Sequence, residues 1–161
     1  VLTPEDVDIY VNLGSAFYDK EDYANALAVY RQALELQPYN AKIHCNLGFL
    51  YWGKGDTDEA IKSYELAIKY NDKYDIAYNN LGVIYLDDLG RVNKSIELFR
   101  KAVDANPNYA LAHFNLARAI SIIGDKVEAA KLYQMAQDIN KITQEIDPRD
   151  IADKISELFE S

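Results

Sequence analysis

Two histidines and one cysteine are the residues of this chain whose types are typical of catalysis. His44 and Cys45 are adjacent, whereas His113 lies far along the chain. A cysteine nucleophile needs a base within hydrogen-bond reach, but successive residues of a helix point in different directions, so His44 and Cys45 do not form such a pair. Both histidines take a ring position of an internal repeat, which indicates packing. We therefore predict no catalytic residue, and that the chain is not an enzyme.

Two further patterns bear on metals and cofactors. Asp56, Asp58 and Glu59 resemble part of a calcium-binding loop, but the length and the terminal bidentate glutamate of that loop are missing. These charges are more typical of a helix start. Asn93–Ser95 is a formal glycosylation sequon, although Ser95 falls at a close-packed position of the repeat. No glycine-rich phosphate loop occurs, so we expect neither a metal nor a cofactor.

Four asparagines at regular spacing could bind a peptide backbone: Asn12, Asn46, Asn80 and Asn115. Asparagine is a mediocre helix former, so helix propensity does not account for their presence inside predicted helices. A carboxamide offers one donor and one acceptor, the complement of a peptide group. The alternative is that these side chains form hydrogen bonds between neighbouring helices.

The asparagines belong to an internal repeat, whose four units begin at Val7, Ala41, Asp75 and Ala110. Each unit has a leucine at the same place: Leu13, Leu47, Leu81 and Leu116. Three places before it stands an aromatic or imidazole ring: Tyr10, His44, Tyr78 and His113. The small residue after each leucine is Gly14, Gly48, Gly82 or Ala117. A second ring, in the second half of each unit, is Tyr30, Tyr64, Phe99 or Tyr133. Such self-similarity is the signature of a stack of supersecondary units.

Each unit is predicted to form two helices, because apolar residues recur at helical spacing in both halves. The turns between halves contain Gly55–Asp56 and Gly124–Asp125, in which the aspartate or its neighbour is available as an N-cap. Gly14 and Ala26 are expected where the two helices approach most closely. The third unit is one residue longer, and we expect the turn within 86–94 to absorb it.

This pattern resembles the tetratricopeptide repeat family over Val7 to about Thr143. The departures are tyrosine or histidine at the usual tryptophan, Ala117 at a usual glycine, and Asp72 and Lys141 at closing prolines. The resemblance implies an all-α fold: an α–α superhelix, or TPR solenoid, of four helix-turn-helix repeats plus a C-terminal capping helix. The repeats are expected at about 7–40, 41–74, 75–109 and 110–143 within a single domain, 1–161. Without its proline, the last repeat helix is expected to continue to about Ile146.

The two ends of the chain carry separate signals. Asp147 and Pro148 predict a helix start, and an apolar stripe follows over about 148–160. This segment is expected to cap the last repeat, or alternatively to dock on another copy as a homodimer. Pro4 holds the place that Pro38 holds before the second unit. Because the chain does not open with methionine, we expect it to be excised from a longer protein.

In a stack of helix pairs, the first helices line a concave groove. Ser15, Tyr18, Asp19 and Cys45 belong to its wall by register. Its middle is apolar, which is typical of a contact surface, and tryptophan is a favoured anchor. The candidate peptide-binding residues are Asn12, Asn46, Asn80, Asn115, Phe49, Trp52, Ile76, Asn79, Val83, Leu86, Phe114 and Arg118. The predicted guest is an extended or helical segment with apolar side chains, and the alternative occupant is a capping helix.

Some tetratricopeptide proteins bind peptide backbones through similar rows of regularly spaced asparagines, called asparagine ladders. The resemblance implies the same role for the four asparagines of this chain. Others bind a C-terminal carboxylate through a clamp of lysines, asparagines and an arginine. Mapped onto the first three units, the clamp positions hold Val11, Ser15, Asn46, Ile76 and Asn80. Only one of these two asparagines stands where the clamp itself has an asparagine, and no lysine or arginine is present at the other places. No carboxylate clamp is therefore expected.

Composition narrows the choice of partner. The chain is 49% hydrophobic and 27% charged, which is globular, and its net charge of −9 repels phosphate backbones. We therefore expect no nucleic acid, and no membrane insertion because no long apolar run occurs. A single cysteine and the absence of a signal sequence favour the cytoplasm. The predicted function is a protein–protein interaction scaffold. The alternatives are the recognition arm of a larger enzyme, such as a protein O-glycosyltransferase, or a self-associating structural module.

Overall fold

The computed structural model describes residues 7–160, and all the regular secondary structure in that range is helical. The chain divides into two compact units, with the division between Ala77 and Tyr78. The predicted all-α repeat fold is confirmed, with first helices that begin at the expected residues. Pro4 and the chain start lie outside the described residues. No helix of the described part is both long and apolar enough to cross a bilayer.

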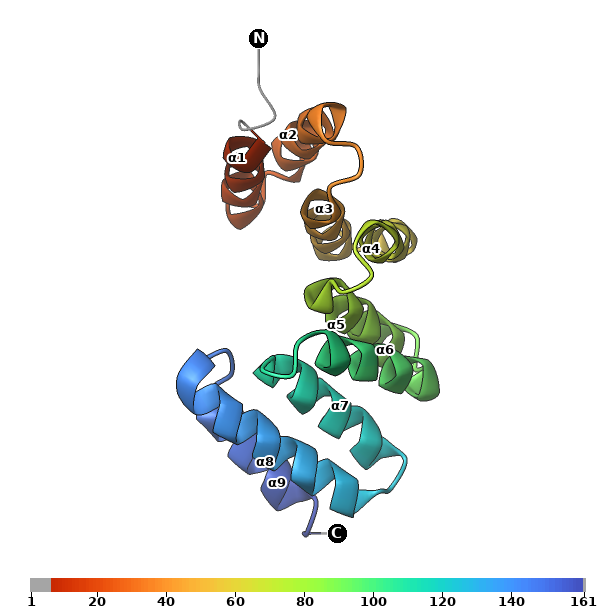
Figure 1. Cartoon of the computed structure of the whole chain (residues 1–161), viewed down its shortest axis with the longest axis vertical. Coiled ribbons are helices and arrows are strands. Elements are labelled where there is room, and N and C mark those ends of the chain that lie inside the picture. Colours follow the sequence, from red (N-terminus) through yellow and green to blue (C-terminus); the bar gives the residue numbers. More distant parts are fainter. Residues whose placement is uncertain (1–6, 161) are drawn as a thin grey trace. The chain divides into compact units, whose positions relative to one another are not determined.

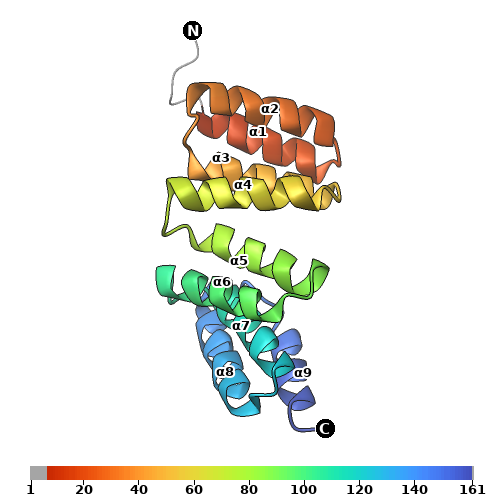
Figure 2. The same ribbon diagram turned by 90° about the vertical axis from the view of Figure 1, so that its right-hand side faces the viewer.

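The first unit consists of two helix pairs and the start of a fifth helix (Figure 1). Its helices are α1 (Val7–Asp19), α2 (Tyr23–Leu36), α3 (Ala41–Gly53), α4 (Thr57–Tyr70) and the beginning of α5 (Asp75–Val83). α1 lies along α2, and α3 lies along α4 (Figure 2). α2 also packs on α3, which joins the two helix pairs.

A ring on each second helix fills the space that a glycine leaves on the first helix. A Cβ atom on Gly14 would lie 2.4 Å from the Tyr30 ring, and one on Gly48 would lie 2.8 Å from the Tyr64 ring. Both rings are buried. Each glycine therefore leaves room for a ring of the second helix, because a Cβ atom at that place would collide with the ring.

The turn within each repeat needs a left-handed backbone residue. Gly55, Gly90 and Gly124 have φ of 84°, 62° and 88°, and the first repeat places Glu21 there with φ of 59°. Glycine adopts this region without steric cost, whereas a residue with Cβ is strained in it. The first repeat thus departs from the other three at the level of the backbone.

The predicted aspartate caps are present in part. Asp125 accepts a hydrogen bond from the Glu128 backbone N–H at 2.9 Å, as an N-cap should. Asp56 occupies the N-cap position of α4 but makes no capping hydrogen bond. Its carboxylate instead pairs with Lys54 at 2.8 Å, so Asp56 has the predicted position but not the capping hydrogen bond. An exposed lysine two residues away competes for the same oxygen.

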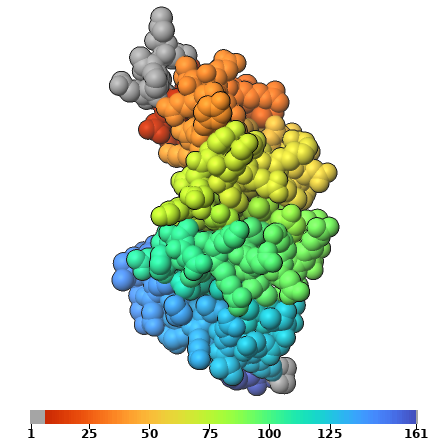
Figure 3. Space-filling model, turned by 45° about the vertical axis from the view of Figure 1, so that its right-hand side comes forward, coloured from red at the N-terminus to blue at the C-terminus, as the bar shows by residue number. Residues whose placement is uncertain are grey.

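The second unit contains the end of α5 and the rest of the chain (Figures 1 and 3). Its further elements are the π-helical turn η2 (Ile84–Asp88), α6 (Val92–Ala105), α7 (Ala110–Ile122), α8 (Lys126–Thr143) and α9 (Pro148–Glu157). Within the second unit, α6 packs on α7, α7 on α8, and α8 on α9.

The π-helical turn accommodates the extra residue of the third repeat. The Leu89 N–H donates to the Ile84 carbonyl five residues back, whereas the Lys54 N–H at the matching turn donates to Leu50, four residues back. A π-turn inserts one residue while the helix continues. The insertion therefore begins inside the helix, two residues before the stretch 86–94 in which we expected it.

α8 is longer than the second helices before it, as predicted, but it ends at Thr143 rather than near Ile146. Gln144 adopts φ of 55°, which stops the helix. The Asn140 carboxamide then bonds both the Ile146 N–H, at 2.9 Å, and the Ile146 carbonyl, at 2.7 Å. A side chain thus replaces the backbone partners that a longer helix would have supplied.

α9 caps the last repeat, as predicted. Asp147 accepts a hydrogen bond from the Arg149 N–H at 2.9 Å, and Pro148 takes the first helical place. Hydrogen bonds from the Arg149 side chain and backbone lower the pKa of Asp147 to about 2. Ile151 and Leu158 are buried in one cluster with Leu116 and Ile120 of α7. The apolar stripe of α9 is therefore largely satisfied within its own chain.

Candidate functional site

The structure brings Asn46 and Phe49 together at a pocket between α1 and α3. This α1–α3 pocket measures about 240 Å³ and is lined by Ser15, Tyr18, Asp19, Tyr30, Asn46 and Phe49. Five of these residues, all except Tyr30, lie on groove positions of the repeat register. Phe49 keeps 42% of its surface exposed, which is high for a phenylalanine in a helix that packs on both sides.

Aromatic rings form one side of the α1–α3 pocket. The Tyr18 and Phe49 ring centroids are 4.8 Å apart, and Tyr23 adds a third ring 5.6 Å from Tyr18. The Tyr18 hydroxyl lies against Gly53, where an added Cβ would be 2.6 Å away. The sequence reasoning missed Tyr23 and Gly53, because the first belongs to a second helix and the second ends a first helix.

A hydrogen-bonded chain closes the polar side of the pocket. The Ser15 hydroxyl donates to the Val11 carbonyl at 3.0 Å, so the Tyr30 hydroxyl, 3.2 Å away, donates to Ser15. Burial raises the pKa of Tyr30, and hydrogen bonds with Ser15 and Asn46 partly offset that rise. Because the Tyr30 proton goes to Ser15, Asn46 donates to Tyr30, which leaves the Asn46 amide oxygen as an acceptor.

The other predicted site residues of the first unit differ in exposure. Asn12 is exposed and Trp52 is half-buried. Ile76 is 41% exposed. Cys45, which the register placed on the groove wall, is buried instead, and burial followed by the nearby Asp75 charge raises the pKa of its thiol to about 12. A protonated buried thiol is unreactive.

In the second unit, two of the predicted site asparagines are buried. Asn79 and Asn115 are 1% and 3% exposed, and the Asn115 amide donates to the Asn79 carbonyl oxygen at 2.9 Å. Asn79 in turn donates to Asn80 at 3.2 Å. The expectation that Asn79 and Asn115 line an open surface is therefore corrected, because they satisfy one another between α5 and α7.

Arg118 completes this asparagine network. Its guanidinium donates to the Asn115 carbonyl oxygen at 3.2 Å and forms an ion pair with Asp87 at 2.9 Å. Asp87 was missed by the sequence reasoning, because it lies in the π-turn whose direction the register does not predict. Arg118 is half-buried, and its charge is partly compensated by the ion pair with Asp87.

The apolar candidates of the second unit contribute to its core. Leu86 is buried, and Val83 and Phe114 pack against the same cluster, which also contains Ile151 of α9. Phe114 meets Tyr133 edge-on, with ring centroids 5.5 Å apart. The expectation of an exposed apolar wall is thus wrong for Leu86, because Leu86 is buried in this core cluster.

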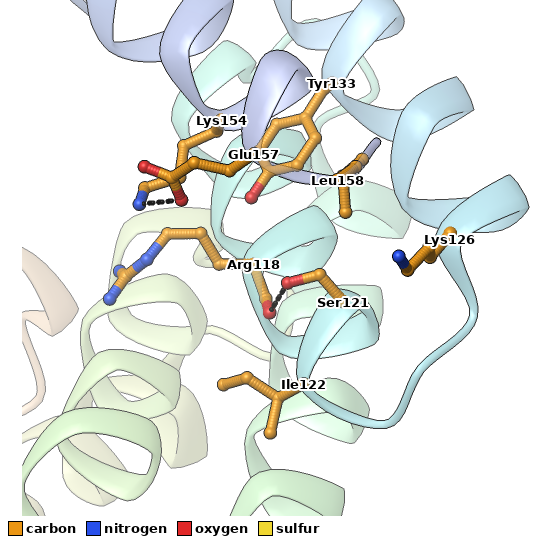
Figure 4. A pocket seen from close by; sticks show the side chains of 8 residues that line it. All are labelled: Arg118, Ser121, Ile122, Lys126, Tyr133, Lys154, Glu157 and Leu158. Carbon is orange, nitrogen blue, oxygen red and sulfur yellow. Dashed lines mark hydrogen bonds and ion pairs between the residues drawn. The ribbon is translucent and has the colours of Figure 1, made fainter. Parts of the chain in front are cut away.

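A second pocket, the α7–α9 pocket, lies within the second unit (Figure 4). It measures about 320 Å³ and is lined by Arg118, Ser121, Ile122, Lys126, Tyr133, Lys154, Glu157 and Leu158. Lys154 pairs with Glu157 at 2.6 Å, and the Ser121 hydroxyl donates to the Arg118 carbonyl at 2.7 Å. In Figure 4 the Tyr133 hydroxyl points into this pocket.

The two pockets occupy the same repeat position. When Gly14 is aligned with Ala117, the α1–α3 residues Ser15, Tyr18, Asp19, Tyr23 and Tyr30 correspond to Arg118, Ser121, Ile122, Lys126 and Tyr133. The shared feature is the tyrosine that covers the small residue. The α1–α3 pocket is acidic and aromatic, whereas the α7–α9 pocket carries basic side chains. The same position of the repeat therefore holds side chains of opposite charge.

The two histidines make the same packing contact. His44 Nε2 lies 2.9 Å from the Pro38 carbonyl oxygen, and His113 Nε2 lies 3.0 Å from that of Pro107. Each imidazole therefore donates to the turn that precedes its own helix. Within residues 7–160, no three histidine, cysteine or acidic side chains gather as metal ligands would.

Comparisons with known proteins agree with this architecture. The TPR repeat family matches residues 14–55, and the Tetratricopeptide repeat family matches residues 45–110 and 85–142. A crystal structure of MamA has 24% identity and a TM-score of 0.73, and covers 89% of this chain and 83% of its own. The TPR2B domain of yeast Sti1, in a complex with pHsp70, has 21% identity and a TM-score of 0.68, and covers 73% of this chain and 94% of its own.

No curated protein matches the chain. The matched family regions nonetheless extend over most of the sequence, and the helix pairs follow the same repeat limits. The chain belongs to the tetratricopeptide repeat family.

Proposed function

We propose that this chain is a protein–protein interaction scaffold that binds an extended or helical segment of a partner protein. Membership of the tetratricopeptide repeat family supports a role in protein interaction. One solved structure of similar fold is described as a complex, the TPR2B domain of yeast Sti1 with pHsp70. That similarity supports the same class of partner for this chain.

The open α1–α3 pocket is the observation that carries the proposal. It places an amide oxygen on Asn46 beside the exposed ring of Phe49, so one guest residue could offer both an N–H and an apolar side chain. Asn12, Trp52 and Ile76 extend this candidate surface within the first unit. In the second unit we retain Asn80 and Arg118 as contacts, and assign Asn79, Asn115 and Leu86 to packing.

Peptide selection on the whole chain tests this function. Peptides would be selected from a random library, and their affinity measured for the wild type and for a variant with Asn46→Ala and Asn80→Ala. Each lost hydrogen bond contributes about 1 kcal/mol, so the double variant should bind roughly 30-fold more weakly. Circular dichroism should remain that of a helical protein.

The matched control replaces two exposed side chains on second helices, Asn93→Ala and Gln134→Ala. This control should bind the selected peptides like the wild type. Equal affinity of the wild type and the Asn46→Ala, Asn80→Ala variant would refute the asparagine contacts. A library that yields no binder at all would count against the scaffold function itself.

A further inference from the structure

We infer that the α1–α3 pocket binds the positively charged side chain of an arginine or lysine in the guest segment. This inference rests on the proposed function and specifies its partner. It adds a basic residue to a guest that the sequence alone described only as apolar.

Asp19 supplies an unpaired negative charge at the pocket. It lines the cavity, and within the described residues it forms no ion pair. Its charge contributes to the raised pKa of both Tyr18 and Tyr30, behind burial, so the carboxylate lies near both phenols. An incoming cation would therefore meet a carboxylate whose charge no protein side chain compensates.

The aromatic rings complete the recognition of a cation. Tyr18 and Phe49 line the pocket, and the Tyr23 ring contacts that of Tyr18. A guanidinium or ammonium group gains energy over the face of an aromatic ring, and arginine also stacks on it. Rings together with a free carboxylate distinguish a cationic side chain from a neutral one of equal length.

The size of the pocket fits one side chain. At about 240 Å³ it is smaller than the typical range of small-molecule sites, roughly 300–1,000 Å³. Because it opens at the surface between two first helices, the guest backbone would stay outside. A single long side chain is the occupant that these dimensions favour.

The corresponding α7–α9 pocket provides an internal comparison. There Ile122 takes the place of Asp19, Lys126 that of Tyr23, and Arg118 that of Ser15. The cations of that pocket are largely compensated, since Arg118 pairs with Asp87 and Lys154 with Glu157. The uncompensated charge of Asp19 therefore does not follow from the repeat itself. The net charge of −9 adds long-range attraction for a basic guest.

Titration with single amino-acid derivatives tests the pocket without any knowledge of the partner. The probe is N-acetylarginine N-methylamide, added to the isotopically labelled full chain and followed by ¹H–¹⁵N NMR. We expect saturable shifts in the millimolar range at residues 15–19 and 46–53. The citrulline derivative, which has the same shape without the charge, should bind more weakly by a factor of about five or more.

Variants separate the contributions of charge and ring. Asp19→Asn removes the carboxylate charge with little change of shape, and should weaken binding of the arginine probe about fivefold or more. Asp8→Asn removes an equal charge from the same helix, away from the pocket, and should have little effect. Gly53→Ala displaces the Tyr18 ring and should also weaken binding, although Gly53 does not line the pocket.

Equal binding of the arginine and citrulline probes, or equal effects of Asp19→Asn and Asp8→Asn, would overturn the inference. Shifts confined to residues outside 15–19 and 46–53 would do the same. These outcomes are distinct from failure of the scaffold function, because the selected peptides report on Asn46 and Asn80 whether or not a basic side chain enters the pocket.

Discussion

At the scale of the residue, Glu21 is the clearest exception to the repeat. The equivalent turns use Gly55, Gly90 and Gly124, all with positive φ, and Glu21 adopts the same region with a side chain. The Gly–Asp pairs of two later repeats predicted those turns from the sequence. The strain at Glu21 could not be predicted, because register shows which residues correspond but not which of them needs a left-handed backbone.

Replacing Glu21 by glycine should stabilise the chain. Relief of the left-handed strain exceeds the entropy that glycine adds to the unfolded state, and we expect a gain of about 1 kcal/mol. Urea unfolding followed by circular dichroism measures it. Lys20→Gly, one residue earlier with negative φ, is the control and should be neutral or destabilising. If Glu21→Gly leaves the free energy of unfolding unchanged, the turn relaxes around the Glu21 side chain and the prediction is wrong.

Residue type and spacing alone did not predict which of the candidate site residues are buried. The regular asparagines were evident from spacing, but their burial was not. Asn115 is buried because Asn79 and Arg118 engage its carboxamide, and Asn79 lies 36 residues earlier in the chain. Asn46 instead meets Tyr30 and an open pocket. One repeat position thus serves packing in one unit and an accessible pocket in the other, according to its neighbours.

At the scale of the element, the helix limits were largely predictable and their exceptions have local causes. Caps and turn glycines are encoded within a few residues, so the starts at Val7, Ala41, Asp75 and Ala110 followed from the sequence. The end of α8 did not, because Asn140 captures the Ile146 backbone through its side chain. The role of α9 as a cap followed from its apolar stripe.

The cap makes a testable contribution to stability. Ile151 of α9 is fully buried in the cluster that α9 shares with α7, and Ile151→Ala should destabilise the chain by about 2–5 kcal/mol through lost burial and a cavity. Phe159→Ala removes a larger side chain that is 68% exposed, and should change stability by less than about 0.5 kcal/mol. Urea denaturation compares the two. Similar losses for both would mean that Phe159 is covered in solution, as in a dimer.

At the scale of the whole molecule, four repeats and the excess of acidic residues were readable from the sequence. The division between Ala77 and Tyr78 was not, because it falls inside α5 and nothing in the repeat register distinguishes that position. The charge balance of −9 is a property of the entire chain and acts over the Debye length, beyond any single pocket.

A basic guest should therefore associate in a salt-dependent way. For a selected peptide with two or more lysines or arginines, raising ionic strength from about 0.02 M to about 0.5 M should lower the association rate constant about tenfold or more. The dissociation rate constant should change less. Stopped-flow fluorescence with a labelled peptide separates the two. A salt effect confined to dissociation would place the attraction in short-range contacts instead.

The π-helical turn at Ile84–Asp88 has a consequence for the evolution of the repeat. It holds a surplus residue by a hydrogen bond that reaches five positions back, where the helix that begins with α5 ends before the turn to α6. Insertion or loss of one residue at this point is therefore structurally tolerated where most positions inside a helix would forbid it. Related arrays are expected to vary in length here, with gaps that interrupt no turn and disturb no neighbouring unit.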